Sequence, residues 1–244
     1  MSPGRGAAPS GQVVLELATG NRYPVQEFSQ SAASVAGARC TDGAVTMALR
    51  PLSAQPRWLE LAAGVPAQGG QAMSCWLELA AAGIEIEPAR VEVYFADIRA
   101  SRANREAWAA LRARGIPWRE TYRKFARIEL APAGETSAAS LAAARRPAGL
   151  DLEIVVLGGQ RIAVGEALDF QVLRDSRPLA GFPVELVSER SALGIWRETD
   201  GDGKLRHTLP FAGRWLLRGT DLRLSALAAD TWESRFVTLA IEAR

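Results

Sequence analysis

The chain has 244 residues, with 29 Lys and Arg against 27 Asp and Glu, and a net charge of +2. This balance excludes the strongly basic face of a nucleic-acid-binding protein, so we expect no nucleic-acid partner. Hydrophobic residues make up 48% of the chain, which is enough to build the core of one large β domain or of two ordinary domains. No stretch approaches the roughly 20 apolar residues of a membrane-spanning helix, and we predict no transmembrane segment.

The number of cysteines bears on the cellular compartment of the protein. Cys40 and Cys75 are the two cysteines of the chain. They suit one disulfide in an oxidising compartment, with two buried free thiols as the alternative. The first ten residues, MSPGRGAAPS, lack the apolar core of a signal peptide. A cytoplasmic protein fits this start, and so does an exported protein whose signal is not part of the sequence.

The first half of the chain predicts short strands. Residues 1–10 are rich in Gly, Pro and Ser and predict a disordered tail. Small and polar residues predict loops at 29–38 and 64–71. Apolar runs and alternation predict strands over residues 12–17, 44–50, 58–62, 73–80, 84–86 and 118–130.

A helical pattern interrupts these strands at residues 88–114. Pro88 suits the first position of a helix, and Ser101 suits the N-cap of a second one. Gly115 is placed to end the second helix. We therefore predict a two-helix insertion. The first helix carries an apolar stripe at i, i+3, i+4 and i+7, formed by Val91, Tyr94, Phe95 and Ile98.

Residues 132–149 are Ala-rich and low in complexity, which predicts a linker between two domains, with a short helix as the alternative. The remaining residues predict seven strands, at 152–157, 167–174, 183–187, 193–199, 204–209, 214–221 and 235–242. The predicted fold is thus mainly β, with two β-sandwich domains at 11–131 and 150–244, the first of which holds the helices.

The run Asp200-Gly201-Asp202-Gly203 predicts a tight hairpin turn. The run does not match the calcium-binding loop of an EF-hand, because Lys204 and Phe211 occupy the fifth and twelfth positions of that pattern, where calcium ligands are required.

The residues offer little for metal or catalytic chemistry. His207 is the single histidine, and its alternation with Leu205 and Leu209 predicts a hydrogen-bonded, partly buried core residue. Transition metals favour clusters of His, Cys and carboxylates, so we predict no metal site and no cofactor. No nucleophile elbow, phosphate-binding loop or dinucleotide motif is present, so we predict a protein that is not an enzyme. A hydrolase with paired carboxylates is a third hypothesis, behind two binding functions.

The best candidate for a functional surface is one face of the strand at 118–130. Trp118, Glu120, Tyr122 and Lys124 share that face and mix aromatic, acidic and basic side chains, as ligand and partner surfaces do. The alternative is a seam between domains, in which Trp118 and Tyr122 pack and Glu120 pairs with Lys124. Three further tryptophans read as core or edge residues of the second sandwich, with a carbohydrate-stacking platform as the alternative: Trp196, Trp215 and Trp232.

The run from Trp118 to Ala126, WRETYRKFA, resembles the WRExYxKxA signature of a bacterial family of periplasmic proteins of unknown function, often labelled as associated with nickel or cobalt uptake. Similar segments follow in the same order: Phe170–Leu173, Arg177–Gly181, Thr199–Gly203, Ala212–Arg218 and Asp230–Ser234. The resemblance covers residues 75–244 well. Members usually carry further histidines, whereas this chain has His207 alone.

The resemblance implies export to the periplasm and a seven-stranded C-terminal sandwich of the transthyretin-like, carboxypeptidase-regulatory-like type with Greek-key order. The implied function is a non-enzymatic accessory or binding protein, associated with metal-ion or other nutrient uptake. Its partner would be a small ligand or an unknown protein such as a transport component. A structural or adhesive module that mediates protein–protein contacts is the alternative.

Overall fold

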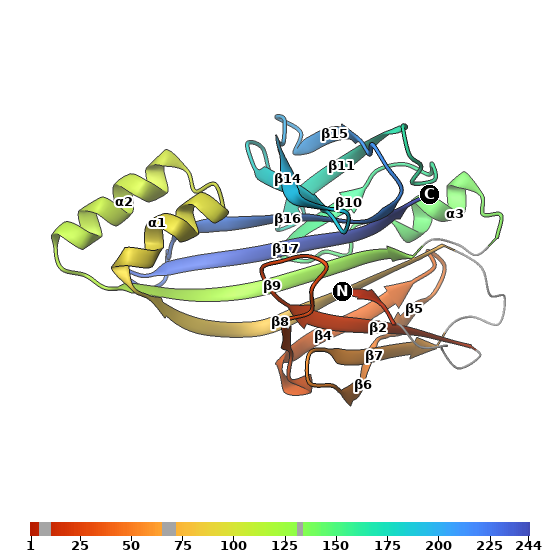
Figure 1. The fold of residues 1–244 in the computed structure, drawn as a ribbon, viewed down its shortest axis with the longest axis horizontal. Coiled ribbons are helices and arrows are strands. Elements are labelled where there is room, and N and C mark those ends of the chain that lie inside the picture. Colours follow the sequence, from red (N-terminus) through yellow and green to blue (C-terminus); the bar gives the residue numbers. More distant parts are fainter. Residues whose placement is uncertain (5–10, 65–71, 131–133) are drawn as a thin grey trace.

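The computed structural model describes residues 1–4, 11–64, 72–130 and 134–244, and in them the chain is mainly β, as predicted (Figure 1). The strands form a central eight-stranded sheet, a five-stranded sheet and a four-stranded sheet. The division into two β-sandwich domains and the Greek-key order of the second stay predictions.

The central sheet takes strands from both halves of the chain, in the order β14-β13-β16-β17-β9-β8-β4-β5. Strand β17 pairs with β9 in parallel, from Trp232 opposite Glu120 to Ala240 opposite Ile128. One sheet therefore extends across the segment predicted to be a linker. Its strands are β4 (Val35–Thr41), β5 (Thr46–Ala48), β8 (Met73–Ile86), β9 (Trp118–Leu130), β13 (Pro183–Ser188), β14 (Ser191–Glu198), β16 (Gly213–Leu224) and β17 (Trp232–Ala243).

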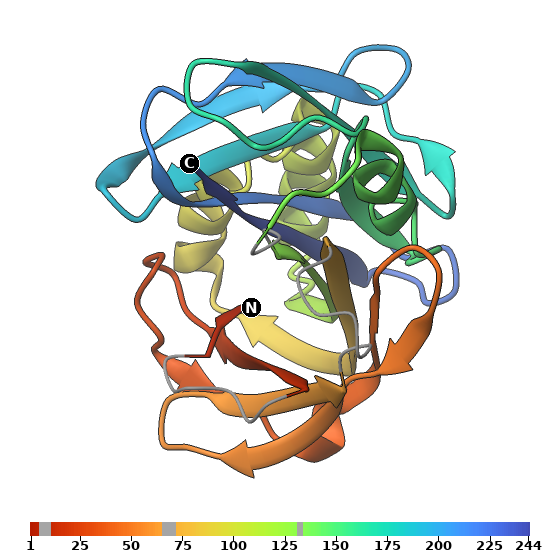
Figure 2. The same ribbon diagram turned by 90° about the vertical axis from the view of Figure 1, so that its right-hand side faces the viewer.

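The smaller sheets pack on opposite faces of the central sheet (Figure 2). The N-terminal sheet contains β1 (Ser2–Pro3), β2 (Gln12–Thr19), β7 (Leu59–Gly64) and β6 (Arg50–Ala54), with β3 (Phe28–Ser29) beside β2. The four-stranded sheet contains β10 (Leu152–Val156), β11 (Ala167–Arg174), β12 (Arg177–Pro178) and β15 (Lys204–Thr208). Side chains of β9 alternate between the two cores, since Ile128 joins the N-terminal core and Phe125 the other one.

The two predicted helices are present as α1 (Pro88–Asp97) and α2 (Arg102–Ala113), and they lie over one end of the long strands (Figure 1). The Ser101 hydroxyl accepts a hydrogen bond from the Asn104 amide, as an N-cap should. Gly115 follows α2 with φ of 72°. The helices bury an aromatic cluster that consists of Val91, Phe95, Ile98, Trp108, Leu111, Trp118, Leu222 and Trp232.

Four predictions from the first half need correction or qualification. The loop expected at 29–38 contains the start of β4, which pairs with β8. The separate strands expected at 73–80 and 84–86 are one strand, β8, with a shift of register between Leu79 and Ala82. Within the tail expected to be disordered, Ser2–Pro3 pairs with β2. Residues 5–10 and 65–71 lie outside the described residues.

The segment at 132–149 contains helix α3 (Ala138–Ala144), which was the alternative to a linker. A buried ionic network fixes it to the sheets. Arg127 of β9 donates to Glu129 at 2.8 Å and to the carbonyl of Ala144 at 3.3 Å. Its guanidinium also lies 3.5 Å from Glu153 of β10. This part of the chain is thus tied to the central sheet by buried charges.

The turn at Asp200–Gly203 is confirmed, but the hairpin expected around it is wrong. The Asp200 carboxylate accepts from the amides of Asp202 and Lys204, and Gly203 has φ of 68°. Strand β14 before the turn pairs with β13, whereas β15 after it pairs with β11. The turn closes its own hydrogen bonds, so it does not require its flanking strands to pair with each other.

Candidate ligand-binding site

A cavity of about 820 Å³ lies on the face of the central sheet that the N-terminal sheet and α1 also cover. The aromatic cluster under the helices lies at one end of this face, and the N-terminal core lies at the other. Strands β8, β9, β16 and β17 supply the floor, and the segment from β2 to β3 supplies the opposite wall. The cavity therefore occupies the part of the sheet face that neither core fills.

Strand β9 brings three of the four predicted surface residues into this cavity. Glu120, Tyr122 and Lys124 line it, because alternate residues of a strand point to the same face. Trp118 points to that face as well but is fully buried in the aromatic cluster. The alternative interpretation was a seam between domains. The burial of Trp118 agrees with that interpretation, but the ion pair that it expects between Glu120 and Lys124 is wrong.

The carboxyl group of Glu120 is held by three donors at the buried end of the cavity. The Tyr94 hydroxyl donates at 3.0 Å and the Trp118 indole N–H at 2.9 Å. The Ser234 hydroxyl of β17 donates as well. Burial raises the pKa of Glu120 above its ordinary value, and the three donors lower it in part. Glu120 thus anchors α1, β9 and β17 to one another.

Lys124 contacts aromatic rings where an anion would be expected. Its ammonium lies 5.3 Å from the ring centre of Tyr122 and 5.8 Å from that of Phe236, within the range of cation–π attraction. Phe236 is its register partner on β17. Within the part of the chain that the structure describes, no carboxylate forms an ion pair with this group. Burial lowers the pKa of Lys124.

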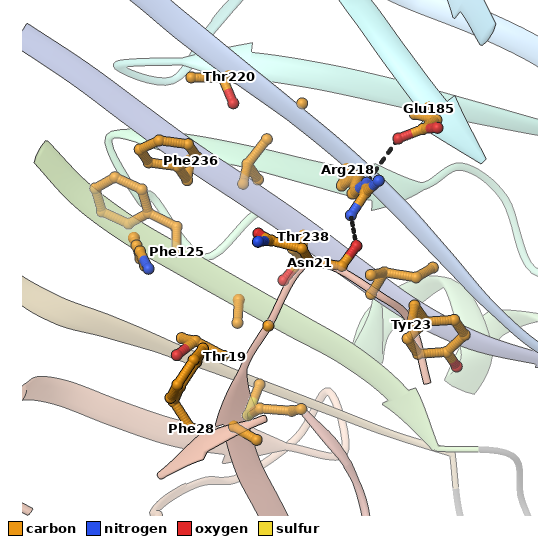
Figure 3. Close-up of a pocket in the computed structure, with 18 of the residues that line it drawn as sticks. Thr19, Asn21, Tyr23, Phe28, Phe125, Glu185, Arg218, Thr220, Phe236 and Thr238 are labelled. Atoms are coloured by element: carbon orange, nitrogen blue, oxygen red, sulfur yellow. Dashed lines mark hydrogen bonds and ion pairs between the residues drawn. The ribbon is translucent and has the colours of Figure 1, made fainter. Parts of the chain in front are cut away.

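An ion pair on the neighbouring strands links the floor to the opposite wall. Arg218 of β16 donates to Glu185 of β13 at 2.7 Å and to the carbonyl of Asn21 at 3.2 Å. Figure 3 shows Arg218 between these two partners, with Thr220, Phe236 and Thr238 along the floor and Thr19, Tyr23 and Phe28 on the opposite side. The segment that follows β2 is thereby fixed across the cavity.

The rim is apolar. Phe28, Val25 and Ile84 line the cavity while 64%, 49% and 45% of each is exposed. A half-buried charge inside and exposed apolar side chains at the opening are features of a small-molecule site.

Residues 119–220 match the family model DUF4198, a domain of unknown function. The match begins within β9 and covers Glu120, Tyr122 and Lys124. Neither a curated protein nor a solved structure matches the chain.

The structure pairs Cys40 with Cys75 as a disulfide between neighbouring residues of β4 and β8. Free thiols, the alternative, are therefore wrong. Among the described residues, no group of three or more His, Cys, Asp and Glu side chains is arranged around a metal position. Helices long and apolar enough to cross a membrane are also absent from the described part of the chain.

His207 is half-buried on the same face as Leu205 and Leu209, as predicted. We expected a hydrogen-bonded histidine, and this expectation is wrong for the Nε2 atom, which is buried without a partner among the described residues. Its register partner on β11 is the apolar Leu168. Of the three further tryptophans, Trp215 lies in the C-terminal core, Trp232 lies under the helices, and Trp196 lines the cavity.

The sequence interpretation missed Phe236, Arg218 and the wall at residues 19–28. Phe236 becomes a neighbour of Lys124 only through the parallel pairing of β17 with β9. Parallel pairing between distant strands leaves no local pattern in the sequence. One signal was available in the sequence: Phe28 is an aromatic residue directly before the predicted loop at 29–38, and the structure leaves it exposed.

Proposed function

We propose that this chain is a non-enzymatic binding protein that takes a small ligand in the cavity between the N-terminal sheet and the central sheet. One observation carries the proposal: a cavity of about 820 Å³ is lined by Glu120, Tyr122 and Lys124. Its volume lies within the roughly 300–1,000 Å³ of small-molecule sites. The single histidine, His207, is not among the lining residues, which favours binding over histidine-dependent catalysis.

We place the protein in the periplasm. The disulfide between Cys40 and Cys75 is typical of an oxidising compartment, and the resemblance to a periplasmic family points the same way. Location can be tested by fractionation of the source cells, with the redox state of the two cysteines measured by thiol labelling.

The association with nickel or cobalt uptake and the transthyretin-like sandwich, both implied by the resemblance, stay proposals. The described residues offer a cavity for an organic ligand more readily than a cluster of metal ligands. Calorimetric titration with Ni²⁺ and Co²⁺ tests the metal role. Binding that His207→Ala abolishes would assign the ligand to the histidine and not to the cavity.

A thermal-shift screen tests the small-ligand function. Libraries of organic acids, amines and neutral compounds would be added to the wild type and to Thr238→Trp, which fills the cavity floor. Thr121→Trp is the matched control, since Thr121 is exposed on the other face of β9. We expect some compounds to stabilise the wild type and Thr121→Trp but not Thr238→Trp. Failure of every compound class, or equal stabilisation of Thr238→Trp, would overturn the proposal.

A protein–protein module is the second candidate, and one observation favours it. Strand β14 is an edge of the central sheet, and its Leu193 is 82% exposed. An exposed edge with an apolar side chain can pair with another chain. Leu193→Lys should abolish self-association or partner capture if this edge is used, and should leave ligand stabilisation unchanged.

A further inference from the structure

The charge within the cavity indicates what kind of ligand fits. We propose that the cavity takes an amphipathic organic monoanion, whose anionic group binds the ammonium of Lys124 and whose apolar body lies against Phe236 and the rim. This inference rests on the proposed function and names the chemical class of its ligand.

Lys124 is a cation without a counter-charge among the described groups of the cavity. The two arginines that line the same cavity are both engaged by carboxylates. Arg218 lies 2.7 Å from Glu185, and Arg214 lies 2.7 Å from Glu189. Buried cations are normally paired, because desolvation is costly for a charge that lacks a partner. The rings of Tyr122 and Phe236 offset part of that cost, and an anionic ligand would offset more of it.

Three of the four described acidic side chains that line the cavity are already occupied, and the fourth, Asp97, is exposed at the end of α1, which disfavours a cationic ligand inside the cavity. Glu120 accepts from Tyr94, Trp118 and Ser234. Glu185 is bound by Arg218, and Glu16 accepts from Gln26 at 2.6 Å. Lys124 is thus a half-buried charge of the cavity that remains open to a ligand, whereas the open acid, Asp97, lies exposed to solvent.

The side chains around Lys124 indicate that the rest of the ligand is apolar. Apolar side chains line the floor of the same cavity; they are Leu77, Leu79, Ala126 and Phe236. The exposed Val25, Phe28 and Ile84 continue this surface to the opening. A hydrocarbon or aryl group would cover the exposed parts of Val25, Phe28 and Ile84, which stabilises the complex by the hydrophobic effect. A fully hydrophilic anion such as phosphate would leave them exposed.

Three probes of equal length separate charge from apolar contact: decanoate, decanol and decyltrimethylammonium. Each would be titrated by calorimetry, below its micelle concentration, into the wild type and Lys124→Met. Methionine keeps the length and the apolar stem of lysine but removes its charge. Lys204→Met is the matched control, because Lys204 is the other lysine of the chain and lies on β15, outside the cavity.

We expect decanoate to bind the wild type and Lys204→Met at least about tenfold more tightly than decanol, as a charge-assisted contact implies. In Lys124→Met, decanoate should bind no better than decanol, while the affinity for decanol is unchanged. Equal affinities of decanoate and decanol for the wild type would overturn the inference, and so would undiminished binding of decanoate to Lys124→Met.

The failure of this inference differs from that of the proposed function. Binding of decyltrimethylammonium or decanol alone, blocked by Thr238→Trp, would leave a ligand-binding cavity and contradict the anionic ligand. No binding by any of the three probes would overturn the inference, and the broader screen with Thr238→Trp would then decide the proposed function by itself.

Discussion

The indole rings of Trp118 and Trp232 stack face to face, with centroids 4.5 Å apart and planes 10° apart. Trp118 begins β9 and Trp232 begins β17, the two strands that join in parallel at the centre of the sheet. Both are buried beneath α1 and α2. The stack therefore connects the helical insertion, the first half of the chain and the last strand in one contact.

Removal of one ring should be costly. Trp232→Ala should lower the free energy of unfolding by about 3–5 kcal/mol, because a large buried side chain is replaced by a void. Urea denaturation followed by circular dichroism measures this. Leu227→Ala is the control: Leu227 is 94% exposed, so its loss should change stability by less than about 0.5 kcal/mol. Similar losses in both variants would contradict the placement of Trp232 in the core.

The disulfide should stabilise the N-terminal part of the fold. Cys40→Ala combined with Cys75→Ala should lower the free energy of unfolding by about 2–4 kcal/mol, since the bond closes a loop across a sequence separation of 35. Chemical denaturation of the wild type with and without reductant provides the comparison. A wild type that is insensitive to complete reduction, verified by thiol counting, would contradict the prediction.

Removal of one partner from the buried ionic network should destabilise the fold strongly. Glu153→Ala leaves Arg127 without this carboxylate and leaves the amides of Ala148 and Gly149 without their acceptor. We expect a loss of about 3–5 kcal/mol in urea denaturation. The matched control is Glu106→Ala, which breaks the exposed pair with Arg102 and should cost less than about 1 kcal/mol. Equal effects of the two variants would contradict a structural role for the network.

Glu120 should make stability depend on pH in a defined direction. Burial raises the pKa of its carboxyl in the folded state above the ordinary value of 4.5. Above pH 4.5 the unfolded chain therefore releases this proton first, and stability falls as pH rises until the folded state also ionises. The stability of the wild type relative to Glu120→Gln should thus decrease between pH 4 and pH 8. An increase over that range would contradict the direction of the shift.

Local patterns predicted the elements well. Proline at the first helical position, the Ser101 cap and the apolar stripe specify α1 and α2 through contacts within a few residues. Alternation placed Glu120, Tyr122 and Lys124 on one face of β9 for the same reason. Such features depend on neighbours in the sequence, so the sequence alone is sufficient for them.

Relationships between distant segments were not predictable. The pairing of β17 with β9 and the separation of β14 from β15 into different sheets depend on the packing of whole layers. The cavity follows from those choices, because Phe236 and Arg218 reach Lys124 and Asn21 only after the layers assemble. Short polar segments such as the start of β4 were also missed, since their strand character comes from the partner β8.

The central claim is that the cavity binds a ligand, and Lys124 can report on it directly. Reductive methylation with ¹³C-formaldehyde labels the two lysines, Lys124 and Lys204, and the α-amino group of the chain. The signal that is lost in Lys124→Met identifies Lys124, and the signal that is lost in Lys204→Met identifies Lys204. A compound that stabilises the protein in the thermal-shift screen would be titrated while the carbon spectrum is recorded. The account predicts a saturable shift of the Lys124 signal with no change at Lys204. A stabilising compound that leaves Lys124 unchanged, or that shifts Lys204 alone, would contradict it.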